Sequence, residues 1–410
     1  MEKLKDGYKE TELGIIPEEW EVKKFAQIFK ISAGRDLIKD HFSPICDNEY
    51  CFPIYSNSLE KRGLYGYTKI ARHKRNSITI TGRGTLGKAN PRYTDFDAIG
   101  RLLVLEPKID LNCAFISEFI NYKVKFFIES TGVPQLTVPQ VSKSLIALPP
   151  LEEQNQIASI LSTVDDLIEN TDHLINSYTL LKKGLMQTLL TKGIGHTKFK
   201  KTEIGIIPED WEVTSLENLG TTYNGLSGKN KEHFGKGKPF IPYKNIFNNT
   251  KIDISYLDFV MIDEDEAQNK VQYGDVFFTT SSETAEEVGY TSVLLDDLKE
   301  TYLNSFCFGY RLNDFNKVRP EFLRYLLRGQ SVRKSIIKIA QGYTRFNLSK
   351  LQVLKILIPI PPIMEQLKIA SILSSVDDRL ELYKSKKEKL NLLKKGLMQQ
   401  LLTGKIRVKV

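Results

Sequence analysis

The sequence has 410 residues, enough for two or three domains, and its hydrophobic content of 41% is ordinary for a folded protein. A formal net charge of +8 favours an anionic partner, although simple solubility explains a mildly basic chain equally well. The first residues are charged and no stretch approaches 18 uncharged apolar residues, so we expect neither a signal peptide nor a membrane span.

The four cysteines, Cys46, Cys51, Cys113 and Cys307, form no CxxC pair and have no neighbouring histidine pattern. This spacing favours a reducing compartment and argues against a structural zinc site or a disulfide framework. The sequence therefore predicts a cytoplasmic protein.

A short segment near the start of the chain occurs twice. Residues 11–22 return as residues 202–213 with ten of twelve positions identical, and the two copies contain the chain's only tryptophans, Trp20 and Trp211. A glycine, a proline and a large aromatic residue are typical of an arm that docks on a surface. We interpret this arm as structural and not catalytic.

Two segments, residues 23–148 and 214–360, differ from each other in length and sequence, and we call them the two heads. Both favour β-structure with tight turns, in the same order of elements. The elements expected are strands at 76–81 and 101–106 and a helix at 114–130 in the first head, strands at 275–280 and 306–312 and a helix at 319–340 in the second, and glycine-containing loops at 131–135 and 341–345.

A longer repeat follows each head. Residues 149–194 return as residues 361–406 at a constant offset, and 26 of the 46 positions are identical. Paired prolines stop the preceding element and pre-set the first turn of a helix, while Glu152 and Glu153 suit its positive end. A close repeat of this length predicts a molecule built from two halves.

Apolar residues in the first copy recur every 3.5 residues, which is typical of a coiled-coil seam. The expected rungs lie at 157, 160, 164, 167, 171, 174, 178, 181, 185 and 188. The second copy carries a similar stripe through Ile369, Ile372, Val376, Tyr383, Leu390, Leu393 and Leu397. We expect the two helices to pair, most tightly towards their ends because residues 384–389 are rich in lysine; the alternative is a helix buried on a globular core.

The fold class expected is therefore α+β, with two mixed heads joined by two long helices that form an antiparallel coiled coil, in a pseudo-twofold repeat. The boundaries expected are 1–148 for the first head with its arm, 149–194 for the first long helix, 195–360 for the second head with its arm at 202–213, and 361–410 for the second long helix and tail.

Both heads contain basic and aromatic residues in glycine-rich segments. Lysine and arginine neutralise phosphates, while arginine, asparagine and tyrosine can read base edges, so these residues are candidates for DNA binding; solvated charged loops are the alternative. The candidates are Lys61, Arg62, Tyr65, Arg72, Lys74, Arg75, Arg83, Lys88, Arg92, Lys229, Lys231, Lys236, Lys238, Tyr243, Lys244, Tyr343, Arg345 and Asn347.

Two motifs resemble enzyme signatures, but each lacks a residue that the signature requires. Residues 82–88 have the spacing of a phosphate-binding loop, but Ala89 replaces the hydroxyl residue that would hold magnesium, and Asn90-Pro91 blocks the helix that should follow. Residues 90–93 read Asn-Pro-Arg-Tyr, in which Arg92 spoils the second proline of the Asn-Pro-Pro-Tyr element of amino-methyltransferases.

Other polar groups also give no catalytic set. The acidic pairs Asp165-Asp166 and Asp377-Asp378 lie at matching points of the long helices, where helix-surface charge explains them better than metal binding. The five histidines have no spacing typical of metal ligands. We therefore expect no catalytic residues and no metal site in this chain.

In its repeats and layout the chain resembles a specificity subunit of a type I restriction–modification system. The resemblance rests on the Leu-Pro-Pro-Leu-Glu-Glu-Gln-x-x-Ile-Ala-x-Ile-Leu run at 148–161, its copy at 360–373, the two Lys-Lys-Gly-Leu-Met-Gln segments and the Ile-Pro-Glu-x-Trp arms. Met364 departs from the first copy, which has Glu152. The resemblance covers the whole layout, but in residues it is strong only in the repeats.

This resemblance implies that each head is a target recognition domain for double-stranded DNA, and that the paired helices hold two modification (methyltransferase) subunits. Restriction (translocase and nuclease) subunits would complete the complex. Methyl transfer and cleavage, with AdoMet, ATP and Mg, would belong to those partners, so this chain is expected to bind no cofactor and to be non-catalytic. Two heads held at a set separation would read two unlike half-sites.

Two other functions stay open on the sequence alone. A stand-alone DNA methyltransferase or nuclease would need the cofactor loop that the sequence lacks. A coiled-coil adaptor without DNA readout would show no steep dependence of DNA binding on salt.

Overall fold

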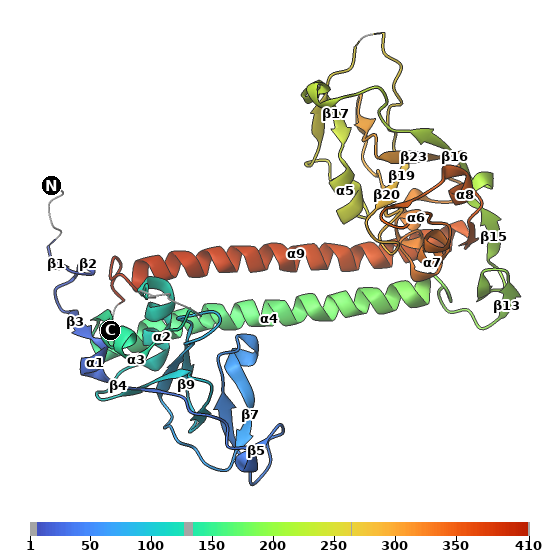
Figure 1. Cartoon of the computed structure of the whole chain (residues 1–410). Coiled ribbons are helices and arrows are strands. Elements are labelled where there is room, and N and C mark those ends of the chain that lie inside the picture. Colours follow the sequence, from blue (N-terminus) through green and yellow to red (C-terminus); the bar gives the residue numbers. More distant parts are fainter. Residues whose placement is uncertain (1–5, 127–133, 264, 409–410) are drawn as a thin grey trace. The chain divides into compact units, whose positions relative to one another are not determined.

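The computed structural model describes residues 6–126, 134–263 and 265–408, and the chain divides into two compact units (Figure 1). Unit 1 comprises residues 1–172 and 385–410, and unit 2 comprises residues 173–384. Each unit therefore contains one head together with part of each long helix, which confirms the predicted α+β class.

The two long helices are α4 (Leu151–Leu189) and α9 (Ile363–Leu401), each of 39 residues. They pack together, and in each unit the start of one helix lies against the end of the other, so they run antiparallel (Figure 1). An apolar stripe this long needs a partner in water, and the second copy of the repeat supplies it. The predicted antiparallel coiled coil is confirmed.

The seam between these helices differs from the predicted one in phase. The less exposed positions of α4 follow alternating steps of four and three residues, and the matching positions of α9 do the same. These positions are 157, 161, 164, 168, 171, 175, 178, 182, 185 and 189 in α4, and 369, 373, 376, 380, 383, 387, 390, 394, 397 and 401 in α9.

Half of the predicted rungs in α4 were therefore wrong by one residue. Leu167 and Leu174 are 42% and 38% exposed, and the seam uses Ile168 and Ile175 instead. Because an apolar residue stands at both positions of each pair, the spacing alone fits either phase. In α9, likewise, Leu393 is exposed and the seam continues through the next residue.

One lysine–aspartate layer recurs in the seam of each unit. Lys182 Nζ lies 2.5 Å from Asp377 Oδ1 in unit 2, and Lys394 Nζ lies 2.7 Å from Asp165 Oδ2 in unit 1. The two contacts are equivalent in the repeat. These aspartates, expected as helix-surface charge, instead bridge the helices, and a polar seam position restricts the register in which two helices can pair.

Each head is built on a four-stranded antiparallel sheet of the same topology. In unit 1 the strand order is β4-β11-β8-β9, and in unit 2 it is β16-β23-β19-β21. The strands are β4 (Phe29–Ala33), β8 (Ser77–Ile80), β9 (Ala89–Arg92), β11 (Leu103–Pro107), β16 (Gly220–Asn224), β19 (Val276–Thr279), β21 (Thr291–Val293) and β23 (Cys307–Leu312).

A smaller sheet accompanies each of these, in the orders β10-β6-β7-β5 and β18-β17-β22. Its strands are β5 (Phe42–Ser43), β6 (Phe52–Tyr55), β7 (Leu64–Thr68), β10 (Asp97–Ala98), β17 (Phe234–Ile241), β18 (Asp258–Val260) and β22 (Tyr302–Leu303). Two-residue strand β20 (Ser281–Ser282) pairs with β24 (Phe346–Asn347).

Short helices cover the sheets. In unit 1 they are α1 (Phe25–Ile28), α2 (Cys113–Lys123) and α3 (Val138–Ser142), and in unit 2 α5 (Tyr243–Asn248), α6 (Pro320–Leu326), α7 (Gln330–Lys338) and α8 (Lys350–Leu354). Short 3-10 turns span Lys39–His41, Glu60–Gly63, Leu216–Asn218 and Lys231–His233.

Two helix predictions need correction. The helix expected at 319–340 is two helices, α6 and α7, because the backbone is extended at Gly329, with φ of −65° and ψ of 147°. A Cβ at this position would also lie 3.0 Å from Leu190 Cδ1. The helix expected at 114–130 ends at Lys123, and its predicted last residues, with most of the loop at 131–135, lie outside the described residues.

The repeated arm forms hairpins in both units and ends in a strand that pairs with the strand before the long helix. These strands are β1 (Tyr8–Thr11), β2 (Gly14–Pro17), β3 (Glu21–Lys24), β12 (Leu145–Leu148), β13 (Phe199–Thr202), β14 (Gly205–Pro208), β15 (Glu212–Ser215) and β25 (Leu357–Ile360).

A glutamate at the start of each long helix, fully buried in unit 1 and 12% exposed in unit 2, holds this arm. Trp20 Nε1 donates to Glu153 Oε2 at 3.0 Å in unit 1, and Trp211 Nε1 donates to Glu365 Oε2 at 3.0 Å in unit 2. Both indole rings are fully buried. Glu153 was expected as helix-end charge, but its side chain is enclosed and acts as the anchor of the arm.

The same carboxylate also binds the segment that follows the end of the other long helix. Arg407 donates to Glu153 Oε1 at 2.8 Å, and His196 Nε2 lies 2.9 Å from Glu365 Oε1. Bonds to Glu153 and Glu19 raise the pKa of Arg407. We call each set of tryptophan, glutamate and basic residue a latch.

No helix among the described residues is long and apolar enough to cross a membrane.

The corrected seam predicts that two leucines of α4 contribute differently to the free energy of unfolding. Leu161→Ala removes a fully buried side chain and should lower the free energy of unfolding by about 2–4 kcal/mol. Leu167→Ala removes a half-exposed one and should change it by less than about 0.5 kcal/mol. Denaturant titration of the purified chain measures both, and equal losses would contradict the assigned phase.

The latch predicts that Glu153→Ala destabilises unit 1, because the buried Trp20 N–H loses its acceptor and the Arg407 guanidinium keeps only Glu19. The expected loss is about 2–4 kcal/mol. Calorimetry should show one unfolding transition moved to lower temperature. Glu152→Ala, which removes the exposed neighbouring carboxylate, is the matched control, and a Glu153→Ala melting curve that overlays it would argue against the latch.

Candidate nucleic-acid interface

Three loops of the first head meet at the side chain of Asn57. Its Oδ1 accepts from the backbone N–H of Gly82 at 2.7 Å and of Arg83 at 3.3 Å, and its Nδ2 donates to the carbonyl of Gly100 at 2.7 Å. Asn57 lies in the β6–β7 connection, Gly82 and Arg83 follow β8, and Gly100 precedes β11. One amide group thus ties together two hairpin loops and the connection between β10 and β11, which joins the two sheets.

These loops display exposed basic side chains. Lys61, Arg62, Arg83 and Arg101 are all exposed, and three of them have a left-handed backbone, with φ of 47° at Lys61, 53° at Arg62 and 67° at Arg101. Bulky residues rarely adopt this conformation, and where they do, the surrounding structure must enforce it. Strained backbone and exposed cationic side chains therefore coincide in these loops.

Arg92 supports this arrangement from below. It is buried, its Nε donates to Thr79 Oγ1 at 2.9 Å, and its guanidinium lies over the Tyr55 ring at 3.5 Å from the centroid. It also donates to the carbonyl of Arg62 at 2.8 Å, which fixes the strained loop. Burial lowers the pKa of Arg92 to about 10. Arg92 is thus placed to position Arg62 and not to touch a ligand itself.

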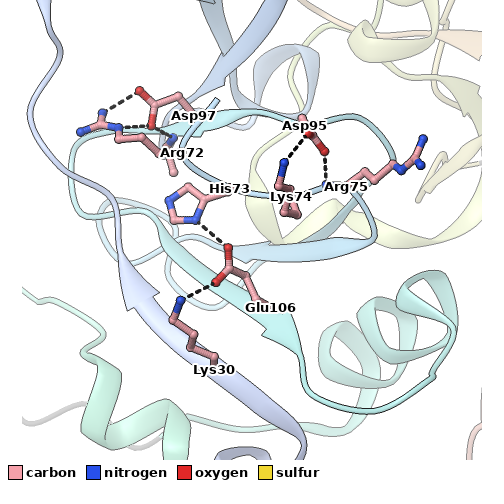
Figure 2. A network of polar contacts seen from close by, with 9 residues as sticks. Lys30, Arg72, His73, Lys74, Arg75, Asp95, Asp97 and Glu106 are labelled. Atoms are coloured by element: carbon pink, nitrogen blue, oxygen red, sulfur yellow. Dashed lines mark hydrogen bonds and ion pairs between the residues drawn. The ribbon is translucent and has the colours of Figure 1, made fainter. Parts of the chain in front are cut away.

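The basic run at residues 72–75 of the same head takes part in a network of polar contacts (Figure 2). Arg72 forms a two-point contact with Asp97, at 2.7 and 2.6 Å. Lys74 Nζ lies 3.1 Å from Asp95, whereas Arg75 bonds Asp95 through its backbone and its guanidinium points away (Figure 2). Arg72 is therefore neutralised within the head, and Arg75 presents its charge outwards.

The remaining candidates of the first head are exposed. Tyr65 packs against Phe42 with ring centroids 5.5 Å apart, and Lys88 ends the loop that follows β8. That loop leads into strand β9 and not into a helix, which agrees with the rejection of a phosphate-binding loop at 82–88.

In the second head, Phe306 stands between two cavities. A cavity of about 370 Å³ is lined by Tyr243, Phe247, Ser281, Ser282, Glu283, Glu287, Phe306 and Arg345. A neighbouring cavity of about 620 Å³ is lined by residues that include Lys229, Lys231, Phe259, Asn304 and Phe306. The Phe306 side chain is 64% exposed, so a large apolar group faces solvent at the rim of both hollows.

Stacked rings make the wall of the smaller cavity rigid. Tyr243 stacks on Phe247 at 5.8 Å, and Phe247 contacts Tyr290 at 5.1 Å. The guanidinium groups of Arg328 and Arg333 lie over the Tyr290 ring at 4.2 and 4.8 Å and donate to backbone carbonyls. These contacts link the Tyr243 and Phe247 rings of the wall to Tyr290 and to the two arginines.

The other predicted residues of the second head fall into two groups. Lys229 pairs with Glu266 and Lys238 with Glu300, so their charges are balanced within the head. The other five are exposed, and Asn347 among them lies in strand β24; they are Lys231, Lys236, Lys244, Tyr343 and Asn347.

Sequence reasoning missed Asn57, Arg101 and Phe306. Arg101 and Phe306 were counted as strand residues, but β11 begins at Leu103 and β23 at Cys307, so both lie in loops. An uncharged asparagine and a lone phenylalanine give no signal in a search for basic runs. Within the described parts of the chain, no three His, Cys, Asp or Glu side chains gather as a metal site would require.

Comparison with known proteins agrees with this layout. The family model described as "Type I restriction modification DNA specificity domain" matches residues 17–178 and 208–392. The putative type I restriction enzyme MjaX specificity subunit of Methanocaldococcus jannaschii is 32% identical, covering 98% of this chain and 97% of that protein. The EcoKI specificity subunit of Escherichia coli is 24% identical over 87% of this chain and 82% of that protein.

Among solved structures, the S subunit of a type I restriction–modification system from M. genitalium has the same fold. Its TM-score is 0.63 at 15% identity, and 97% of each chain is covered. A chain from a structure that describes complex assembly of a type I system gives a TM-score of 0.51 at 18% identity, covering 95% of this chain and 99% of that one.

Proposed function

This chain belongs to the type I restriction–modification DNA specificity family, and we propose that its two heads each read one half of a bipartite, asymmetric DNA site. Proteins of this kind are non-catalytic subunits that give a type I complex its DNA specificity. One observation carries the proposal: the arm and the long helix occur twice as close copies, whereas the exposed loop residues of the two heads differ.

The two heads share one sheet topology but differ in the chemistry of their loops. The first presents Lys61, Arg62, Arg83 and Arg101 around Asn57, whereas the second presents an aromatic residue between two cavities. Exposed cations suit phosphates and guanine edges, and cavities lined by mixed polar and aromatic groups suit other base edges. Unlike loops on one scaffold support unlike half-sites.

The repeated helices offer one apolar surface per unit for a modification subunit. Leu180 is 70% exposed in unit 2, and its repeat equivalent Leu392 is 70% exposed in unit 1. Beside them, Leu181 and Leu393 are also exposed, and Gly184 and Gly396 have open space where a Cβ would stand. Identical exposed apolar residues on both copies support two equivalent docking sites for two identical partners.

On this proposal the cofactors belong to the partners. AdoMet would be bound by the modification subunits, and ATP and Mg by restriction subunits, while this chain contributes recognition and scaffolding. A DNA-reading role inside the cell is consistent with the cytoplasmic location that the cysteine pattern predicts, and that location stays part of the proposal.

Exchange of the first head tests bipartite reading. Residues 23–148 are replaced by the matching segment of the M. jannaschii relative, and the chimera is produced with its modification subunits. Methylome sequencing should show one half of the methylated motif changed and the other retained, because each head reads only its own half. A motif that changes in both halves, or in neither, would refute the assignment.

The same system tests the helices as the spacer. Insertion of seven residues into both α4 and α9 keeps the seam phase and adds about 10 Å to each helix. The gap between half-sites should grow by about three base pairs at 3.4 Å each, with both half-sites unchanged. An altered half-site would show that the insertion disturbs the heads themselves.

The two proposed docking sites predict how many modification subunits each variant of this chain can bind. The double substitution Leu180→Ser with Leu181→Ser should remove one modification subunit, and Leu392→Ser with Leu393→Ser should remove the other, because each pair supplies one apolar surface. Native mass spectrometry counts the copies. Leu351→Ser, at an exposed leucine of α8, is the control; a full complement in both double variants would place docking elsewhere.

A further inference from the structure

Arg101 and Phe306 occupy the same position in the two heads. Strand pairing fixes this equivalence: Leu103 of β11 pairs with Ala33, and Phe308 of β23 pairs with Asn224, each at the end of the neighbouring strand. Arg101 and Phe306 both stand two residues earlier. The equivalence is invisible in the sequence, since an arginine and a phenylalanine share neither charge nor shape.

The two loops that carry them are held in the same way. A glycine that follows the neighbouring strand, Gly34 or Gly225, touches the loop so closely that a Cβ would lie 2.8 Å from Ala98 or 2.1 Å from Asn304. The residue after that glycine donates to the matching carbonyl in each head, from Arg35 to Ala98 at 3.1 Å and from Leu226 to Leu303 at 2.8 Å. Both tips are therefore fixed to the edge of the main sheet.

Further bonds stiffen each tip. In the first head, Arg101 N–H donates to the Gly34 carbonyl at 3.2 Å, and Asn57 holds the Gly100 carbonyl. In the second, Phe306 N–H donates to Asn304 Oδ1 at 2.8 Å, and the Phe306 carbonyl accepts from Thr280 N–H at 3.0 Å. The side chains point outwards from rigid loops, which is the arrangement that a specific contact requires.

We propose that this position is the base-reading position of each head, where Arg101 contacts a guanine in one half-site and Phe306 contacts a thymine methyl in the other. This inference rests on the proposed DNA-reading function and adds the residues that set specificity. Arginine binds guanine O6 and N7 with both arms of its guanidinium, and an apolar side chain suits the thymine methyl.

The strained backbone distinguishes a reading role from a general phosphate contact. A phosphate contact needs only a positive charge near the backbone, which a flexible lysine in an unstrained loop supplies. Arg101 instead sits at a φ of 67°, where a glycine would be more stable. Maintaining an arginine there is consistent with a contact that depends on the position and direction of its side chain.

The first test uses Arg101→Gly in the complete complex with its modification subunits. Glycine relieves the positive φ, so the loop keeps its conformation while the side chain is lost. Methylome sequencing of cells producing the variant should show one guanine of the first half-site become degenerate, with the second half-site unchanged. Discrimination at that base pair should fall by roughly 5- to 150-fold, the range that a two-point contact supplies.

Two further variants serve as comparisons for Arg101→Gly. Arg101→Lys keeps the charge but loses the two-armed geometry, so it should also relax that position. Lys108→Ala removes an exposed charge at the other end of β11 and should leave the motif intact. An unchanged motif in Arg101→Gly, or weaker methylation with every position still specified, would overturn the proposal, the second result showing a phosphate contact.

The second test uses Phe306→Ala and DNA in which each thymine of the second half-site is replaced in turn by uracil, which lacks the methyl group. The wild-type complex should lose roughly fourfold in affinity at one thymine, the value of one buried methyl-sized group. The Phe306→Ala complex should show no loss there. Phe199→Ala, which removes an exposed aromatic from the arm, is the control and should behave as wild type.

The outcome separates this inference from the broader proposal. If head exchange changes one half-site while neither the Arg101 nor the Phe306 variants alter any position, the heads read DNA through other residues. If head exchange itself leaves the motif unchanged, the DNA-reading function fails. A uracil effect that persists in Phe306→Ala would likewise reject the methyl contact.

Discussion

A carboxylate buried at the first turn of each long helix connects three parts of its unit. Glu153 and Glu365 each accept from the indole of the arm, and each binds a basic residue that follows the other long helix. A buried charge is costly unless it is fully bonded, so none of the three parts can leave without exposing an unpaired group. The arm, the helix start and the tail therefore form one cooperative element in each unit.

This element explains why the repeats are close copies while the heads are not. The tryptophan–glutamate pair of the latch and the lysine–aspartate layer recur at matching repeat positions and depend on the identity of their residues. The turn at each helix end also uses a glycine, which is shifted by one position between the two copies. Gly193 has a φ of 66° and would meet Glu365 with any side chain, and Gly404 has a φ of 68° and would meet Pro17. The loop tips of the heads need only a fixed backbone, which leaves their side chains free to differ.

The two heads share a scaffold but carry different side chains at equivalent positions of their loops. Equivalent glycines hold equivalent loops against the main sheet, yet one tip carries Arg101 and the other Phe306. Specificity placed on rigid elements is more precise than specificity placed on mobile ones. In the first head, hydrogen bonds from Arg92 and Asn57 hold the loops, and in the second, aromatic and cation–π contacts around Tyr290 hold the wall of one cavity.

Periodicity and repetition in the amino-acid chain were sufficient to predict two halves, two long paired helices and an α+β class, because an apolar stripe 40 residues long has few ways to leave water. They did not decide the phase of the seam, since Leu167-Ile168 and Leu174-Ile175 satisfy either choice, and only packing against α9 selects one. The basic runs drew attention to Lys61, Arg62 and Arg83, but not to which cations are neutralised. That distinction, and the convergence of three loops on Asn57, depends on contacts between residues 21 to 62 positions apart, which composition and spacing do not encode.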